Sequence, residues 1–304
     1  MKIGIDIGGS HIATGIVLDR GNLLGKETRD IDISKINDQK RVEKLIIDTI
    51  ENEVKLLLER YDYSIGDISK IGIAVPGSPT NETIQNLVNL HIKKFEIGKI
   101  LEEKYNTKIK IKNDGKCAGI AEKKYGSLTQ YQDCIFLCLG TGVGSAVFLD
   151  GELLEPKRHP GFEFGHMIID KDGNKCNCGN NGCFETYASM KRFKNKVVEE
   201  LKLDNNLQSE EVQAYIRENI NKNKKVEKLV DEYINNVAIG ISNIINIFEP
   251  EAISFGGSFS YYEDIFLERL SKKLNEYIFN KDSKVKLISA KLKNDAGIIG
   301  AAEL

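Results

Sequence analysis

The sequence repeats one design, a strand followed by a glycine-rich turn and a second strand, about half a chain apart. The first copy runs from Lys2 to Leu18 and turns at Gly8-Gly9-Ser10; the second runs from Cys134 to Leu149 and turns at Gly140-Thr141-Gly142-Val143-Gly144. Each turn offers backbone N–H groups that can bind phosphate, and glycine lets a phosphate approach closely. A fold with two such loops could hold a polyphosphate from both sides.

Strands alternate with helices over the rest of the chain, which places the protein in the α/β class. Apolar spacing predicts helices over Arg41–Glu59 and Gly115–Tyr125, and two or three charged surface helices between Met190 and Val237. The other predicted elements are strands at Ser69–Val75, Lys108–Lys112, Glu251–Phe255 and Val285–Ile288, a helix at Tyr261–Tyr277 and a terminal helix from Asp295.

The length and the net charge of this chain limit the kinds of protein that it can be. The 304 residues predict about two domains, and a net charge of −2 argues against a nucleic-acid partner. No apolar run reaches the ~18 residues of a membrane helix, and the N-terminus lacks the pattern of a signal peptide. We therefore expect a cytoplasmic protein without a membrane partner, whose thiols stay reduced.

Three of the six cysteines lie in one polar loop downstream of a histidine. Together they form a Cys₃His set typical of a structural zinc site: His166, Cys176, Cys178 and Cys183. Four protein ligands would close the coordination shell, so we interpret the zinc as a structural clip. Three unrelated core cysteines would be unexpected in so polar a loop. The remaining cysteines, Cys117, Cys134 and Cys138, are expected to pack in the core, and His11, His91 and His159 receive no catalytic role.

Several carboxylates stand where chemistry is favoured. Asp114 follows a strand and precedes a helix, so it could accept a proton from an attacking hydroxyl or simply cap the helix. Asp6 could hold Mg²⁺ through water, or cap a neighbouring N–H. Glu163 and Glu185 flank the cysteine loop and could accept sugar hydroxyls, or be plain surface carboxylates. Gly256-Gly257 could seat the adenosine of a nucleotide, or allow close packing of a strand on a helix.

These motifs, in this order, resemble those of the ROK family, named for repressors, open reading frames and kinases. The resemblance covers nearly the whole chain, and the cysteine loop with its upstream Glu-x-Gly-His is its most specific part. It resembles the zinc-containing, glucokinase-like subgroup. The motifs are Asp6-Ile7-Gly8-Gly9-Ser10, Pro76-Gly77, Asn113-Asp114, Leu139–Gly144, Glu163–His166, the cysteine loop ending in Glu185, Gly256-Gly257, and Asp295–Gly300.

The resemblance implies a two-domain, actin-like α/β fold (ribonuclease H-like, ASKHA) with an interdomain cleft. The small domain would comprise residues 1–112 plus 293–304, and the large domain residues 113–292. The first phosphate loop would belong to the small domain. The second phosphate loop, the zinc clip and the sugar site would belong to the large one, and the last helix would cross back to the first domain.

The resemblance also implies roles for individual residues. Asp114 would be the catalytic base, and the sugar would be held by Gly77, Asn113, Glu163, His166 and Glu185. His166 would bind the sugar while its other ring nitrogen binds zinc. ATP and Mg²⁺ would bind at Asp6, Gly8, Gly9, Ser10, Gly140, Thr141, Gly142, Gly256 and Gly257. Two details depart from the common pattern: Gly115-Lys116 replaces small residues, and Ser10 stands where threonine is usual.

The expected activity is ATP-dependent phosphorylation of a free hexose, with glucose to glucose 6-phosphate as the first choice. N-acetylmannosamine, N-acetylglucosamine, fructose and allose are alternatives. A sugar-sensing ROK repressor would need an added helix-turn-helix domain, for which a first strand at residue 2 leaves no room. A glycosidase using Glu163 and Glu185 would leave both glycine loops and the zinc clip without a purpose. The family implies a homodimer or a dimer of dimers.

Overall fold

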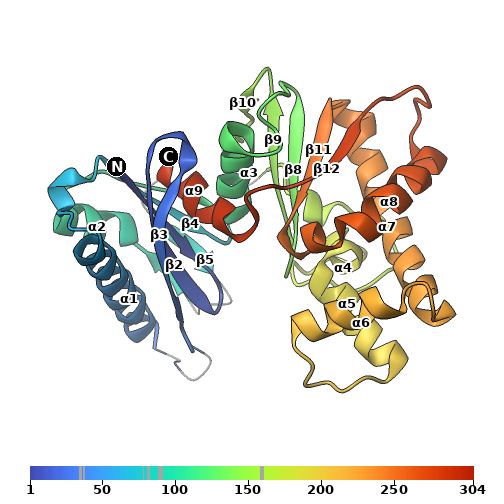
Figure 1. Ribbon diagram of the computed structural model, residues 1–304, viewed down its shortest axis with the longest axis horizontal. Coiled ribbons are helices and arrows are strands. Elements are labelled where there is room, and N and C mark those ends of the chain that lie inside the picture. Colours follow the sequence, from blue (N-terminus) through green and yellow to red (C-terminus); the bar gives the residue numbers. More distant parts are fainter. Residues whose placement is uncertain (34–35, 37, 78, 81–82, 88–91, 158–160) are drawn as a thin grey trace. The chain divides into compact units, whose positions relative to one another are not determined.

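The chain forms two compact units in the computed structural model (Figure 1). Unit 1 comprises residues 1–130 and 291–304, and unit 2 comprises residues 131–290. The structure describes residues 1–33, 36, 38–77, 79–80, 83–87, 92–157 and 161–304. Among these residues, no helix combines the length and the apolarity that crossing a bilayer requires.

The first boundary falls after Gln130 rather than after residue 112, because helix α3 (Asp114–Tyr125) packs against the terminal helix α9 (Ala296–Ala302). The two backbones approach so closely that a Cβ on Gly300 would lie 1.7 Å from the Cys117 carbonyl oxygen. Helix α3 therefore belongs to unit 1. Helix α9 lies in unit 1 as well.

Unit 1 is built on a five-stranded sheet with the order β3-β2-β1-β4-β7. The pairs β1–β2 and β2–β3 are antiparallel, whereas β1–β4 and β4–β7 are parallel. The strands are β1 (Lys2–Ile7), β2 (His11–Val17), β3 (Leu23–Asp30), β4 (Lys70–Val75) and β7 (Ile109–Asn113). A separate antiparallel pair, β5 (Ile84–Leu87) and β6 (Ile92–Phe95), has no counterpart in the predicted elements.

Helix α1 (Gln39–Arg60) shows why the predicted helix forms. Asp38 caps its N-terminus by accepting a hydrogen bond from the Arg41 N–H at 3.1 Å. A stripe at helical spacing is buried against β2 and β3: Val42, Ile46, Ile50, Val54 and Leu57. Unit 1 also contains the shorter helix α2 (Ile97–Tyr105).

Unit 2 repeats the sheet of unit 1, with the order β10-β9-β8-β11-β12. Again the first three strands are antiparallel and the last two join in parallel. The strands are β8 (Cys134–Leu139), β9 (Val143–Leu149), β10 (Glu152–Leu153), β11 (Ala252–Gly256) and β12 (Lys286–Ser289). The duplication inferred from two hairpins thus extends to both whole sheets.

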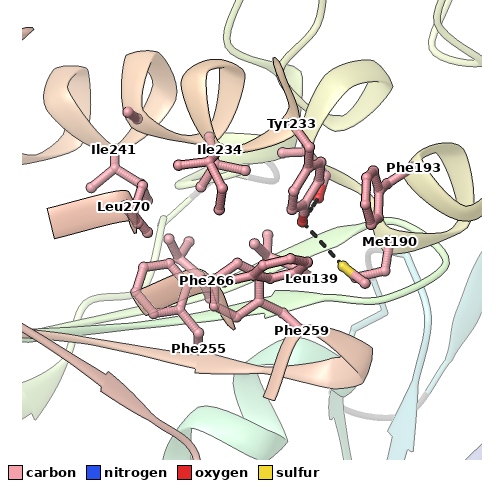
Figure 2. Close-up of a cluster of buried hydrophobic side chains, with 14 of the residues drawn as sticks. Leu139, Met190, Phe193, Tyr233, Ile234, Ile241, Phe255, Phe259, Phe266 and Leu270 are labelled. Atoms are coloured by element: carbon pink, nitrogen blue, oxygen red, sulfur yellow. Dashed lines mark hydrogen bonds between the residues drawn. The ribbon is translucent and has the colours of Figure 1, made fainter. Parts of the chain in front are cut away.

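The helices of unit 2 depart from one expectation. They are α4 (Glu185–Ala188), α5 (Met190–Leu201), α6 (Ser209–Asn219), α7 (Lys224–Phe248) and α8 (Glu263–Tyr277), the last preceded by a 3-10 segment, η5 (Gly257–Tyr262). The predicted charged helices end at Val237, whereas α7 continues to Phe248 through apolar turns, and its apolar face is buried in the core. Figure 2 shows Tyr233 and Ile241 of this helix facing Phe255 and Phe266. The Tyr233 hydroxyl donates to the Ala188 carbonyl at 2.9 Å, which ties α7 to α4.

Candidate functional site

The first glycine loop joins β1 to β2 in unit 1, and Asp6 lies just before it. A Cβ on Gly297 would lie 2.2 Å from Asp6 Oδ2, so the carboxylate sits against the start of α9. Burial raises the pKa of Asp6 to about 6. Among the described residues the Asp6 carboxylate accepts no hydrogen bond that would support the capping alternative. A buried carboxylate of this kind gains most from a cation such as hydrated Mg²⁺.

Asn113, and not Asp114, caps helix α3. Its Oδ1 accepts a hydrogen bond from the Lys116 N–H at 3.1 Å, and its Nδ2 donates to the Gly77 carbonyl at 2.9 Å. Asp114 is the first residue of the helix and is half-buried. Its Oδ1 accepts a hydrogen bond from the Gly115 N–H at 2.8 Å. The cap position of α3 is therefore taken by Asn113 and not by Asp114, contrary to the alternative role suggested for Asp114.

The strand register brings these residues of unit 1 to one edge of the sheet. Asp6 pairs with Ala74 across β1–β4, and Val75 pairs with Asn113 across β4–β7. Burial, and after it the charges of Asp6 and Asp114, raise the pKa of Cys117 well above its usual value. Both carboxylates are thus close enough to act on the same buried thiol. This is the group expected at the carboxyl ends of parallel strands.

The second glycine loop joins β8 to β9 in unit 2, and Glu185 lies against it. Glu185 Oε2 accepts a hydrogen bond from the Val143 N–H at 2.9 Å. A Cβ on Gly142 would lie 2.5 Å from the same oxygen, whereas a Cβ on Gly140 would meet nothing within 4 Å. The loop is also held by the Lys191 N–H, which donates to the Gly140 carbonyl at 3.1 Å. Thr141 at its tip is exposed.

A short 3-10 segment, η4 (Phe164–His166), packs on the same strand start. A Cβ on Gly165 would lie 2.8 Å from the Val143 carbonyl oxygen and 3.5 Å from Glu185 Cβ. Glu163 directly precedes this segment, and His166 ends it. The predicted sugar ligands of unit 2 therefore come from two segments that meet at Val143. Sequence reasoning assigned no role to Val143 or Gly165; the only available signal was the position of Gly165 between the predicted sugar ligands Glu163 and His166.

The Cys₃His set gathers into one cluster in unit 2. The ligand atoms of His166, Cys176, Cys178 and Cys183 all lie within 4.8 Å of one another. The Cys178 and Cys183 sulfurs are 3.6 Å apart, and Cys176 Sγ lies 3.8 Å from His166 Nδ1. Two sulfur ligands of a tetrahedral zinc with bonds of about 2.3 Å lie about 3.8 Å apart, so these side chains fit zinc. Because Nδ1 faces the cluster, Nε2 is the ring nitrogen left for another partner.

The backbone of the cysteine loop is folded for this cluster. The Cys176 N–H donates to the Asn180 carbonyl at 2.8 Å, which closes a tight hairpin. Gly182 has a φ of 72°, and a Cβ there would lie 1.5 Å from the Asp170 carbonyl oxygen. Only glycine fits this position. The loop can therefore approach the chain at Asp170 and present its cysteines together.

Gly256 ends β11 and Gly257 begins η5, beside the second glycine loop. Gly257 has a φ of 65°, and a Cβ there would lie 2.7 Å from the Leu139 carbonyl oxygen. A Cβ on Gly256 would lie 2.5 Å from the Phe136 ring. Both glycines thus lie close to strand β8, which is a different contact from the packing of a strand on a helix that the sequence suggested as an alternative. Of the remaining histidines, His11 is exposed beside Gly8, and His91 and His159 lie outside the described residues.

Known proteins of similar sequence include both kinases and repressors. A glucokinase of Thermotoga maritima is 26% identical, with 99% of this chain and 96% of that protein covered. An N-acetyl-D-glucosamine kinase of Aliivibrio fischeri is 28% identical, with 100% and 99% covered. A xylose repressor of Caldicellulosiruptor bescii is also 28% identical, with 98% of this chain and 76% of the repressor covered.

The fold is likewise that of solved sugar kinases. The ROK hexokinase of Thermus thermophilus superposes with a TM-score of 0.80 at 26% identity, covering 99% of this chain and 97% of that one. The α/β architecture with two similar mixed sheets is therefore the actin-like fold that the motifs implied. The ROK family model matches residues 2–304. With its motifs, its two glycine loops and its fold in agreement, the chain belongs to the ROK family.

Proposed function

We propose that this protein transfers the γ-phosphoryl group of ATP to a free hexose, with glucose as substrate and Asp114 as general base. The observation that carries the proposal is that Asn113 and Asp114, two adjacent residues at the start of α3, make different contacts. Asn113 caps the helix and fixes Gly77, so the adjacent carboxylate of Asp114 is not needed for capping. A carboxylate at that sheet edge, together with Asp6, supports a base beside a magnesium ligand.

In the proposed reaction, Glu163, His166 and Glu185 of unit 2 hold the sugar hydroxyls. The two glycine loops would bind the phosphates through backbone N–H groups, and Asp6 would hold Mg²⁺ through water. Asp114 accepts the proton of the C6 hydroxyl while the oxygen of that hydroxyl forms a bond to the γ-phosphorus. The bond from that phosphorus to the bridging oxygen breaks, and ADP leaves.

The zinc cluster has a supporting part in this proposal. His166, Cys176, Cys178 and Cys183 would hold one zinc ion, which supplies no reactant and fixes the loop. Through Nδ1 the cluster would orient the His166 ring, so that Nε2 meets a sugar hydroxyl. The homodimer or dimer of dimers expected from the family stays a prediction.

The test is phosphoryl transfer from ATP with Mg²⁺ to a panel of glucose, N-acetylglucosamine, N-acetylmannosamine, fructose and allose. We expect ADP and hexose 6-phosphate in equal amounts, with glucose giving the highest kcat/KM. Asp114→Asn keeps the side-chain shape and should lower kcat by about 10²–10⁴-fold while the hexose Kd changes little. The matched control is Asp62→Asn, an exposed aspartate of unit 1 with a φ of 57°, which asparagine tolerates. Near-normal turnover of Asp114→Asn would reject the base assignment.

A second candidate is a sugar-sensing protein without transfer activity, because the xylose repressor matches as well as the kinases do. Hexose binding without ADP release in the same panel would favour it. If N-acetylglucosamine or fructose gave the highest kcat/KM, the reaction would stand and the choice of glucose would be wrong.

A further inference from the structure

The second glycine loop shares a carboxylate with the sugar ligands of unit 2. We infer that Gly142, assigned above to phosphate binding, is also a positioning residue for the sugar, acting through Glu185. The inference rests on the proposed function, because it takes Glu185 as a sugar ligand. It adds that the loop sets the position of that ligand even when no nucleotide is bound.

The geometry at Glu185 carries the inference. The carboxylate oxygen Oε2 of Glu185 accepts a hydrogen bond at 2.9 Å from the N–H of Val143, the residue that directly follows Gly142. The space that a side chain at position 142 would need is taken by that same oxygen, 2.5 Å from an ideal Cβ. Glu185 is half-buried, which limits its freedom to move aside. The absence of a side chain at 142 is therefore a condition for the position of Glu185.

A second contact links the loop to the other sugar ligands. Gly165, between Glu163 and His166, brings its backbone against the Val143 carbonyl, where a Cβ would lie 2.8 Å from the oxygen. Val143 thus holds Glu185 with its N–H and packs η4 with its carbonyl. A displacement of the loop moves both segments that carry sugar ligands.

The loop also offers a matched control. Gly140 and Gly142 both have a backbone conformation that alanine can adopt, since neither has a positive φ. A Cβ on Gly142 meets Glu185, whereas a Cβ on Gly140 meets nothing within 4 Å. The same chemical change two residues apart therefore separates an effect on Glu185 from a general effect on the loop.

The experiment is a double-mutant cycle on the Kd for glucose, or for the hexose with the highest kcat/KM in the panel, measured by calorimetry without nucleotide. Gly142→Ala and Glu185→Ala should each raise this Kd about tenfold or more, because a hydrogen bond to a charged group is lost or distorted. In the double variant the loss should equal that of Glu185→Ala alone, since no carboxylate remains to be displaced. Gly140→Ala should leave the hexose Kd unchanged, within about twofold, in both backgrounds.

Two results would overturn the inference: losses that multiply in the double variant, or equal losses for Gly140→Ala and Gly142→Ala. If the wild type binds no hexose, the proposed function fails first and the inference falls with it; hexose binding with multiplying losses sinks the inference alone. Should Gly142→Ala fail to fold, hydrogen exchange of residues 140–144 in the wild type decides. Exchange there should slow on adding hexose without nucleotide, and unchanged exchange in a hexose-binding protein would refute the coupling.

Discussion

Glu53 makes the stability of unit 1 depend on pH in a way that one substitution should remove. The side chain lies on α1 and is 1% exposed, with Oε2 accepting a hydrogen bond from the Thr14 hydroxyl at 2.6 Å. Among the described residues, Oε1 has no hydrogen-bond partner. Burial raises the pKa of Glu53 from 4.5 to about 7, although the Thr14 hydrogen bond and Arg29 lower it in part. The folded state therefore prefers the neutral acid.

The sign and the size follow by linkage. Between pH 4.5 and about 7 the unfolded chain has lost the proton that the folded protein keeps, so the free energy of unfolding falls as pH rises through this window. The rise of the pKa from 4.5 to about 7 corresponds to a loss of about 3 kcal/mol, complete above about pH 7. Glutamine keeps the acceptor for Thr14 and cannot ionise.

Compared with the wild type, Glu53→Gln should therefore gain about 3 kcal/mol between pH 4.5 and pH 8. The raised pKa of Asp6 should still make the stability of both proteins fall as the pH rises to about 6. Urea unfolding followed by circular dichroism measures the difference, and hydrogen exchange of α1 peptides assigns the transition to unit 1. Glu59→Gln, which removes an exposed carboxylate from the same helix, should run parallel to the wild type. Parallel curves for Glu53→Gln and the wild type from pH 4.5 to pH 8 would refute the reasoning.

Other perturbations test the zinc cluster, the sugar site and the core of unit 2. The purified protein should contain about one zinc per chain by metal analysis, and active protein without zinc would contradict the clip. Glu185→Ala should raise the hexose Kd far more than the ATP Kd; equal losses would assign Glu185 elsewhere. Ile241→Ala, in the buried face of α7, should lower the free energy of unfolding by about 2–5 kcal/mol, against under 0.5 kcal/mol for the exposed Glu232→Ala of the same helix.

Local patterns predicted the paired hairpins and most strands, because period-two alternation and glycine turns are set within a few residues. The boundary between the units was not predictable in this way. It depends on the contact of Gly300 with Cys117, two residues far apart in the sequence. The extent of helix α7 was misjudged, since the prediction stopped at Val237 and missed the apolar turns up to Phe248.

The candidate site was predictable where side chains carry the chemistry and not where the backbone does. The Cys₃His set is specific by residue type and spacing, and the structure brings its ligand atoms together. Asp114 could be distinguished from a helix cap only once Asn113 was seen in that role. The Val143 N–H that holds Glu185 belongs to an apolar residue, so no feature of its side chain could reveal it.

The two glycine loops are each backed by a carboxylate, but the two carboxylates are held in opposite ways. In unit 1, Asp6 lies half-buried against Gly297 and its pKa is raised, a state that a cation would relieve. In unit 2, Glu185 is held by a backbone N–H, which leaves Oε1 for a neutral hydroxyl. In the reaction proposed above, the carboxylate beside the first loop would therefore serve the metal and the one beside the second loop the sugar, although both loops come from the same sheet topology. Neither carboxylate should tolerate the other's side-chain length. In Glu185→Asp the shorter side chain should lose the hydrogen bond from the Val143 N–H. In Asp6→Glu the longer side chain has no room beside α9.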